Sequence, residues 1–173
     1  MKRASSRFLR LFLVVALVTA IAGSLVPVTK AAGAVDVGSV TLSTTSAGKV
    51  AQYTIGMNHL ADVPIGGTLT VTFPLGTTVP SSIAASAISV SQVSSTPTTK
   101  VLNLAPTVAG RAVTLISPIA IDNGSSTIIF STTAGITNPS AKAYIGAKTL
   151  SVASSAEVAG TTGSYTIVQT FVV

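Results

Sequence analysis

Few residues in this chain have side chains that could do chemistry. Its one histidine, His59, stands three residues before Asp62, and serines are common throughout. A Ser–His–Asp hydrolase needs a nucleophile placed by a specific turn, and no G-x-S-x-G motif is present. A metal site on His59 and Asp62 would lack two or more further ligands. The surrounding MNHLADVPIGG is typical of a loop between strands, so we expect His59 to face solvent.

Carboxylates are also scarce, with four acids after residue 35. A glycosidase needs two of them facing one bond, but Asp122 belongs to a DNG turn and Asp36 stands close to the expected mature N-terminus. We therefore expect no enzymatic activity and no cofactor. Calcium at Asp122 or Asp62 stays open, because Ca²⁺ accepts six to eight oxygens of mixed origin, although no D-x-D-x-D-G spacing occurs.

Residues 1–34 have the layout of a secretory signal peptide. MKRASSRFLR carries four positive charges and no acid, an apolar run begins at Leu11, and an A-x-A site ends at Ala34. We expect cleavage after Ala34, with Ala31 as the second choice. A retained membrane anchor over residues 11–28 is the alternative, which the glycine and proline within it weaken. The sequence thus predicts a secreted, extracellular protein at the cell surface, outside the membrane once the leader is removed.

Removal of the leader changes the charge of the protein. The 139 residues after position 34 keep five Lys or Arg and four acids, a net charge of +1 in place of +6. No basic cluster remains to neutralise several phosphates, so nucleic acid is not an expected partner. Of these residues 42 are Ser or Thr. Such a neutral hydroxyl surface lacks the charge repulsion that keeps monomers apart, which favours self-association or contact with a saccharide-rich cell wall.

Short runs of alternating apolar and polar residues fill the rest of the chain. In residues 67–74 the alternation sets Leu69, Val71 and Phe73 on one face and threonines on the other. The runs are 37–43, 50–57, 67–74, 83–93, 99–108, 111–121, 127–134, 148–155 and 164–173. The Ala-rich first half of 83–93 is compatible with a helical turn, and Asn123-Gly124 predicts a tight type I′ hairpin.

Strands at this spacing, with no convincing amphipathic helix, predict an all-β fold. We expect a single Ig-like or jelly-roll β-sandwich of roughly eight to ten strands over residues 35–173. Without cysteine, its stability must come from packing, hydrogen bonds or association with neighbours.

Several turn and core motifs resemble a known extracellular domain. GGTLTVTFPLGTTVPSSI, and GITNPS followed by LSVASSAE, are similar to segments of a β-sandwich domain that occurs, often in tandem, in bacterial cell-surface proteins of the surface-layer and adhesin type. The likeness spans most of residues 40–157. It implies a fold and an extracellular setting but no chemistry.

Both ends of the mature chain are β-prone segments, VDVGSVTLS at the front and the uncharged GSYTIVQTFVV at the back. In GSYTIVQTFVV apolar side chains occur on both faces, which indicates a strand covered on both sides. Unpaired edges of this kind are templates for a further strand, so we expect copies to join by strand addition. The alternative is that both ends pair within one monomer. The candidate subunit contacts are Val35, Val37, Val40, Leu42, Tyr165, Ile167, Phe171 and Val173.

These features predict a non-enzymatic structural subunit of an extracellular filament, sheath or surface layer, with the protein itself as its partner. The alternative function is a monomeric binding or adhesion module that recognises a saccharide or a protein. Such a module would use the loops 58–66 and 135–147.

Overall fold

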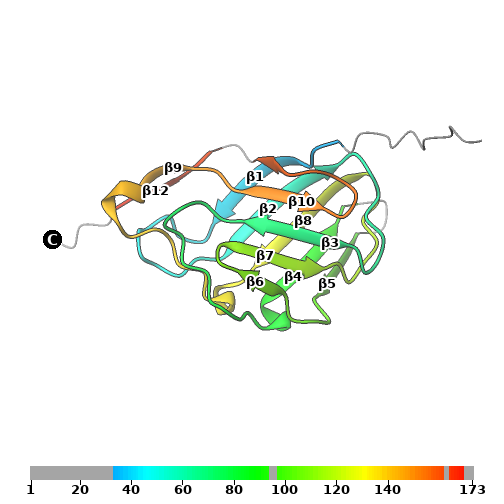
Figure 1. The fold of residues 1–173 in the computed structure, drawn as a ribbon, viewed down its shortest axis with the longest axis horizontal. Coiled ribbons are helices and arrows are strands. Elements are labelled where there is room, and N and C mark those ends of the chain that lie inside the picture. The colour runs from blue at the N-terminus through cyan, green and yellow to red at the C-terminus, as the bar shows by residue number, and fades with distance from the viewer. Residues whose placement is uncertain (1–32, 94–96, 162–163, 170–173) are drawn as a thin grey trace, which may run out of the picture. The chain divides into compact units, whose positions relative to one another are not determined.

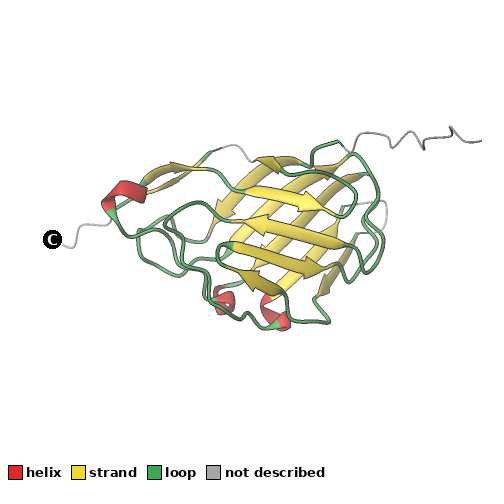
Figure 2. Cartoon of the chain, viewed as in Figure 1, coloured by secondary structure: helices red, strands yellow, loops and turns green. Residues whose placement is uncertain are grey.

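The computed structural model describes residues 33–93, 97–161 and 164–169, which form β-strands and three short 3₁₀ turns (Figure 2). All strand pairings within its sheets are antiparallel. The predicted all-β class is confirmed. Within the described residues there are twelve strands rather than eight to ten, and the additional ones are short. The expected leader lies outside these residues except for Gly33 and Ala34.

The first sheet has five strands in the order β1-β2-β8-β4-β5. Its longest ladder joins β2 and β8 over seven residue pairs, from Tyr53 opposite Phe130 to His59 opposite Gly124. The strands are β1 (Asp36–Leu42), β2 (Tyr53–His59), β4 (Ile88–Gln92), β5 (Thr98–Val101) and β8 (Gly124–Phe130).

The second sheet also has five strands, in the order β11-β10-β3-β7-β6, and a separate two-stranded pair joins β12 to β9. Figure 1 shows the strands of this sheet lying across those of the first. The strands are β3 (Thr68–Thr72), β6 (Thr107–Ala109), β7 (Ala112–Ile116), β9 (Gly146–Lys148), β10 (Ser151–Ser154), β11 (Gly160–Thr161) and β12 (Tyr165–Ile167).

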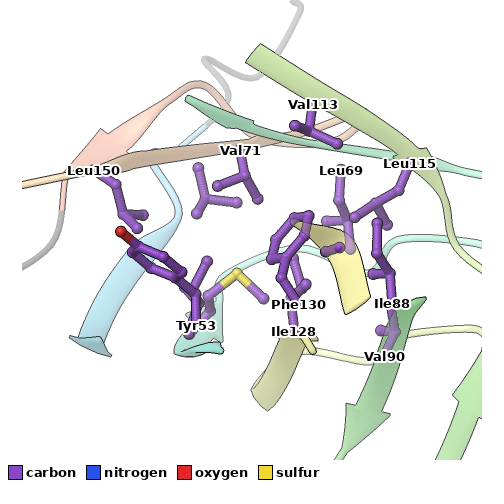
Figure 3. Close-up of a cluster of buried hydrophobic side chains, with 14 of the residues drawn as sticks. Tyr53, Leu69, Val71, Ile88, Val90, Val113, Leu115, Ile128, Phe130 and Leu150 are labelled. Atoms are coloured by element: carbon purple, nitrogen blue, oxygen red, sulfur yellow. The ribbon is translucent and has the colours of Figure 1, made fainter. Parts of the chain in front are cut away.

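The core fills the space between the two sheets because alternate side chains of each strand point inward. Leu69 and Val71 of β3 are fully buried, as predicted, and the threonines between them are half-buried. Figure 3 shows them facing side chains from β2, β4 and β8. Phe73 packs edge-on against Tyr53 and Phe130, with ring centroids 5.2 and 5.4 Å apart. This arrangement is the favoured geometry for aromatic pairs.

The prediction for residues 83–93 is confirmed, and the hairpin predicted at Asn123-Gly124 is wrong. A 3₁₀ turn (Ala85–Ala87) leads directly into β4. The strands on either side of Asn123, β7 and β8, belong to different sheets. The turn crosses between sheets instead, and it is held by the Asp62 carboxylate, which accepts a bond from Asn123 N at 2.7 Å. The two other 3₁₀ turns are Thr132–Ala134 and Lys142–Tyr144.

Candidate assembly surface

Two clamps hold the end segments of the described chain together. In the first clamp Val35 N donates to Val158 O and Val158 N donates to Gly33 O, at 3.1 and 3.0 Å. In the second clamp Ala47 N donates to Val168 O and Val168 N donates to Thr45 O, at 2.8 and 2.9 Å. The segment that includes β11 and β12 is therefore hydrogen-bonded near both of its ends to the segment that contains β1.

The structure describes six of the eight predicted subunit contacts and places four of them inside the molecule. Val35, Val37, Tyr165 and Ile167 are buried in the core, so freeing either terminal strand would expose apolar side chains to water. Val40 and Leu42 are half-buried. Phe171 and Val173 lie outside the described residues.

One side of β1 keeps unused backbone groups. Ser43 N donates to Gln52 O, and the ladder continues from there with Leu42 opposite Tyr53 and Val40 opposite Ile55. Hydrogen-bonded and non-hydrogen-bonded pairs alternate in an antiparallel ladder, so the N–H and C=O groups of Val40 and Leu42 point away from β2. No partner is found for these groups in the described part of the chain, and β1 carries no Lys or Pro to block an approaching strand.

The margin of the sandwich opposite β1, formed by the edge strands β5 and β6, is better protected against pairing with another molecule. Its edge strands, β5 and β6, have only four and three residues. Lys100 is exposed on β5, and Pro106 directly precedes β6. Short edges, lysine and proline discourage pairing between molecules, as do β-bulges. The irregularity in β1 lies between Asp36 and Ser39, before the stretch that contains Val40 and Leu42. Of these two margins, that of β1 is therefore the more favourable for strand addition.

A buried polar network joins the two sheets at the end of β2. His59 Nδ1 lies 2.6 Å from Glu157 Oε2, and both side chains are fully buried. His59 Nε2 lies 2.9 Å from Ser126 Oγ on β8. The other carboxylate oxygen, Glu157 Oε1, accepts a bond from Leu60 N at 2.6 Å. The network thus satisfies the polar groups of three side chains within the core.

This network corrects the prediction of a solvent-facing His59. The alternation of Tyr53, Ile55 and Met57 continues for two more residues, which puts His59 on the inward face of β2. Its contacts have the order of a Ser–His–Glu triad. However, Ser126 is buried and lies in the middle of a strand, so its Oγ is not presented to a substrate. The network can stabilise the fold, and its geometry gives no support to a hydrolytic role.

A second buried polar cluster lies at the other end of β2. Tyr53 donates to Asn138 Oδ1 at 2.6 Å, and Asn138 Nδ2 donates to the carbonyl oxygens of Thr44 and Ser46. Burial raises the pKa of Tyr53 from 10.0 to about 12. Burial also raises the pKa of Tyr165, and the neighbouring Tyr53 adds to that rise. Both phenols therefore stay neutral at physiological pH.

A surface hollow of about 320 Å³ lies beside β5. Lys100 and Asp122 both line it, together with the Gln92 carboxamide and the exposed Ile65. Ile65 also lines an adjoining hollow of about 150 Å³. Of the two loops predicted to bind a ligand, 58–66 reaches these hollows through Ile65. The loop 135–147 does not line them, because it follows the opposite end of β8.

The acids proposed for calcium, Asp62 and Asp122, both lie close to Asn123. The part of the chain that the structure describes holds no group of three His or acidic side chains arranged to bind a metal ion. Among the same residues, no helix has the length and apolar character needed to cross a membrane.

Comparison with known proteins gives one likeness to report. No protein-family model and no curated protein matches the chain. A solved structure described as BslA, a bacterial hydrophobin, matches with a TM-score of 0.45 and 12% sequence identity, covering 79% of this chain and 98% of that chain.

Proposed function

We propose that this protein is a non-enzymatic structural subunit of an extracellular assembly, a filament, sheath or surface layer, built from copies of itself. The observation that carries the proposal is the outer side of β1, where the backbone groups of Val40 and Leu42 have no partner in the described chain. Such an edge is a template for another strand. The secretory layout of residues 1–34 supports an extracellular location.

The surface composition supports the same proposal. The outward positions of β3 are threonines and those of β4 are serines, so the faces of the sandwich are polar but carry little charge. Neutral faces of this kind do not repel one another as copies approach. Self-association then needs only a modest attractive contact.

The clamps limit the form that strand addition takes. Exchange of β1 between copies would have to pass through a state in which the first clamp is broken and Val35 and Val37, which are buried, are exposed. Edge-to-edge pairing on the outer side of β1 leaves every internal bond in place. We therefore propose pairing at this edge and not exchange of a terminal strand.

A Val40→Pro variant tests this contact. The Val40 N–H points away from β2, so proline removes one outward donor and leaves the internal ladder intact. We expect a folded protein whose assembly, followed by size-exclusion chromatography and negative-stain microscopy, is strongly reduced. Val101→Pro is the matched control, because the Val101 N–H points outward from β5 and assembly should persist. A parent chain that stays monomeric at high concentration would refute the structural role itself.

The hollow beside β5 supports a second candidate, a monomeric binding module. A volume of about 320 Å³ is at the lower limit of small-ligand pockets, about 300 Å³, and the hollow contains one cation, one anion and a carboxamide. Titration of the exported protein with cell-wall saccharides, followed by NMR shifts of Lys100 and Gln92, tests it. Saturable binding by a stable monomer would favour this function over assembly.

A further inference from the structure

The formal charges of the sandwich are separated along its length. β2 runs from Tyr53 to His59, so Lys49 precedes it at one end and Asp62 follows it at the other. β8 runs antiparallel to β2, which puts Asp122 at the same end as Asp62. Lys142, which follows β8, lies at the same end as Lys49.

The remaining charged residues follow the same division. β10 begins after Lys148 and leads to Glu157, and Asp36 pairs with Asn58 near the end of β2. The Arg111 guanidinium donates to the carbonyl oxygen of Phe73, at the end where β3 finishes. In Figure 1 the arrow of β10 points away from β9 and β12. Among the cations that the structure describes, Lys100 on β5 departs from this pattern, because it lines the same hollow as Asp122. We call the two ends the acidic pole (Asp36, Asp62, Asp122) and the basic pole (Lys49, Arg111, Lys142, Lys148). Glu157 lies at the acidic end but is buried against His59, so it is not counted in this surface.

Each pole also exposes large apolar side chains. At the acidic pole Leu60, Ile65 and Val158 are 60%, 69% and 55% exposed. At the basic pole Val50, Leu75 and Val168 are 44%, 60% and 46% exposed. The strand positions between the poles carry mostly hydroxyl groups on their outer sides. Exposed apolar groups gathered in one region mark an interaction surface.

We infer that the acidic pole of one copy docks on the basic pole of the next. The charges are complementary, and the apolar side chains of both poles would leave water together. The two surfaces differ, so the contact is head-to-tail and repeats without closing, which gives a filament. This inference rests on the proposed structural role. It adds a longitudinal contact between poles that is separate from edge pairing at β1.

Engineered disulfides distinguish the two contacts. The chain has no cysteine, so a Leu60→Cys, Val50→Cys double variant can form only the bonds introduced. Its two thiols lie at opposite ends of β2 and are too far apart for a bond within one molecule. Under oxidation we expect a ladder of covalent dimers, trimers and higher oligomers on a denaturing gel. The matched control is Ser39→Cys with Val101→Cys, exposed positions on the two lateral margins.

The gel separates failure of the inference from failure of the proposed function. Disulfide-linked dimers or a ladder from the lateral pair alone, in a protein that still assembles, overturn the pole contact and leave the structural role standing. A parent chain that remains monomeric, with no ladder from either pair, overturns both. A ladder from the pole pair supports the inference.

Charge reversal is the second test of the pole contact. Asp36→Lys with Asp122→Lys, or Lys49→Glu with Lys142→Glu, places like charges at the contact. Each double variant should raise the concentration for half-assembly about tenfold or more, and an equimolar mixture of the two should form mixed pairs by restoring opposite charges at one contact. Thr107→Glu, at an exposed position of β6 opposite the middle of β7, is the control and should have little effect. Assembly of both double variants at the parent concentration contradicts the inference.

Discussion

His59 and Glu157 come from opposite sheets of the sandwich, and their side chains meet in its interior with Nδ1 and Oε2 2.6 Å apart. β2 supplies the imidazole, and the turn after β10 supplies the carboxylate. A contact of this kind links the two layers at a position where the alternation of a strand would otherwise place an aliphatic side chain. It fixes how the end of β2 sits against the second sheet.

Loss of this contact should weaken the fold. His59→Ala leaves the Glu157 carboxylate buried without its imidazole partner, and breaking a buried pair in this way costs about 3 to 5 kcal/mol. We expect the free energy of unfolding, measured by urea denaturation, to fall by about that amount. Asn58→Ala, at the exposed neighbouring position, is the control and should cost much less. An equal effect of the two substitutions would contradict the structural role assigned to the network.

The same burial should keep Ser126 unreactive. Its Oγ lies 2.9 Å from His59 Nε2 but is covered by the core, so a fluorophosphonate probe has no route to it. We expect no adduct by intact-protein mass spectrometry in the native state. An adduct mapped to Ser126 by peptide analysis would show that the site opens and would revive a hydrolytic function.

Much of the fold could be predicted from alternation alone. The positions of Leu69, Val71 and Phe73 followed from the threonines between them, because strand side chains alternate between faces. The hairpin predicted at Asn123-Gly124 was wrong because a local turn preference cannot show whether the next strand joins the same sheet or the opposite one. Glu157 and His59 are distant in sequence, so no local pattern could reveal their contact. His59 itself could have been placed by extending the alternation of β2 by two residues.

Alkaline pH should destabilise the protein through its buried phenols. Burial raises the pKa of Tyr53 from 10.0 to about 12, so the unfolded chain ionises first. The stability that the neutral Tyr53 phenol contributes to the folded state is complete below pH 10 and is lost as the pH rises toward 12. The loss from Tyr53 is about 2 to 3 kcal/mol, and it should appear as a falling urea midpoint. Tyr53→Phe should flatten that fall, and a parent midpoint that does not change over this range would contradict the prediction.

The first clamp bears on which of the two predicted cleavage positions, after Ala34 or after Ala31, is used. Cleavage after Ala34 would put a charged ammonium at Val35, which is only 2% exposed, and would remove the Gly33 carbonyl that accepts from Val158 N. Cleavage after Ala31 preserves both bonds of the clamp. We therefore expect the exported protein to begin at Ala32, by N-terminal sequencing and intact mass. A mature chain that starts at Val35 would contradict this prediction.

Gly160 should tolerate no side chain. A Cβ at this position would overlap the carbonyl oxygen of Val35, which belongs to the first clamp. We expect Gly160→Ala to accelerate proteolysis near residue 35 under native conditions and to lower the melting temperature. Gly110→Ala, where a Cβ meets no atom within 4 Å but φ is +60°, controls for backbone strain alone. An equal fall of the melting temperature in both variants would show that contact with Val35 is not the cause.

The second clamp also constrains the order in which parts of the molecule can fold. Val168 must be present before the backbone at Thr45 and Ala47 finds its partner, and almost the whole domain separates them in the chain. In the export that we propose, the amino end leaves the cell first, so this flank cannot close until Val168 has emerged. Closure of this flank is therefore expected to be a late step of folding.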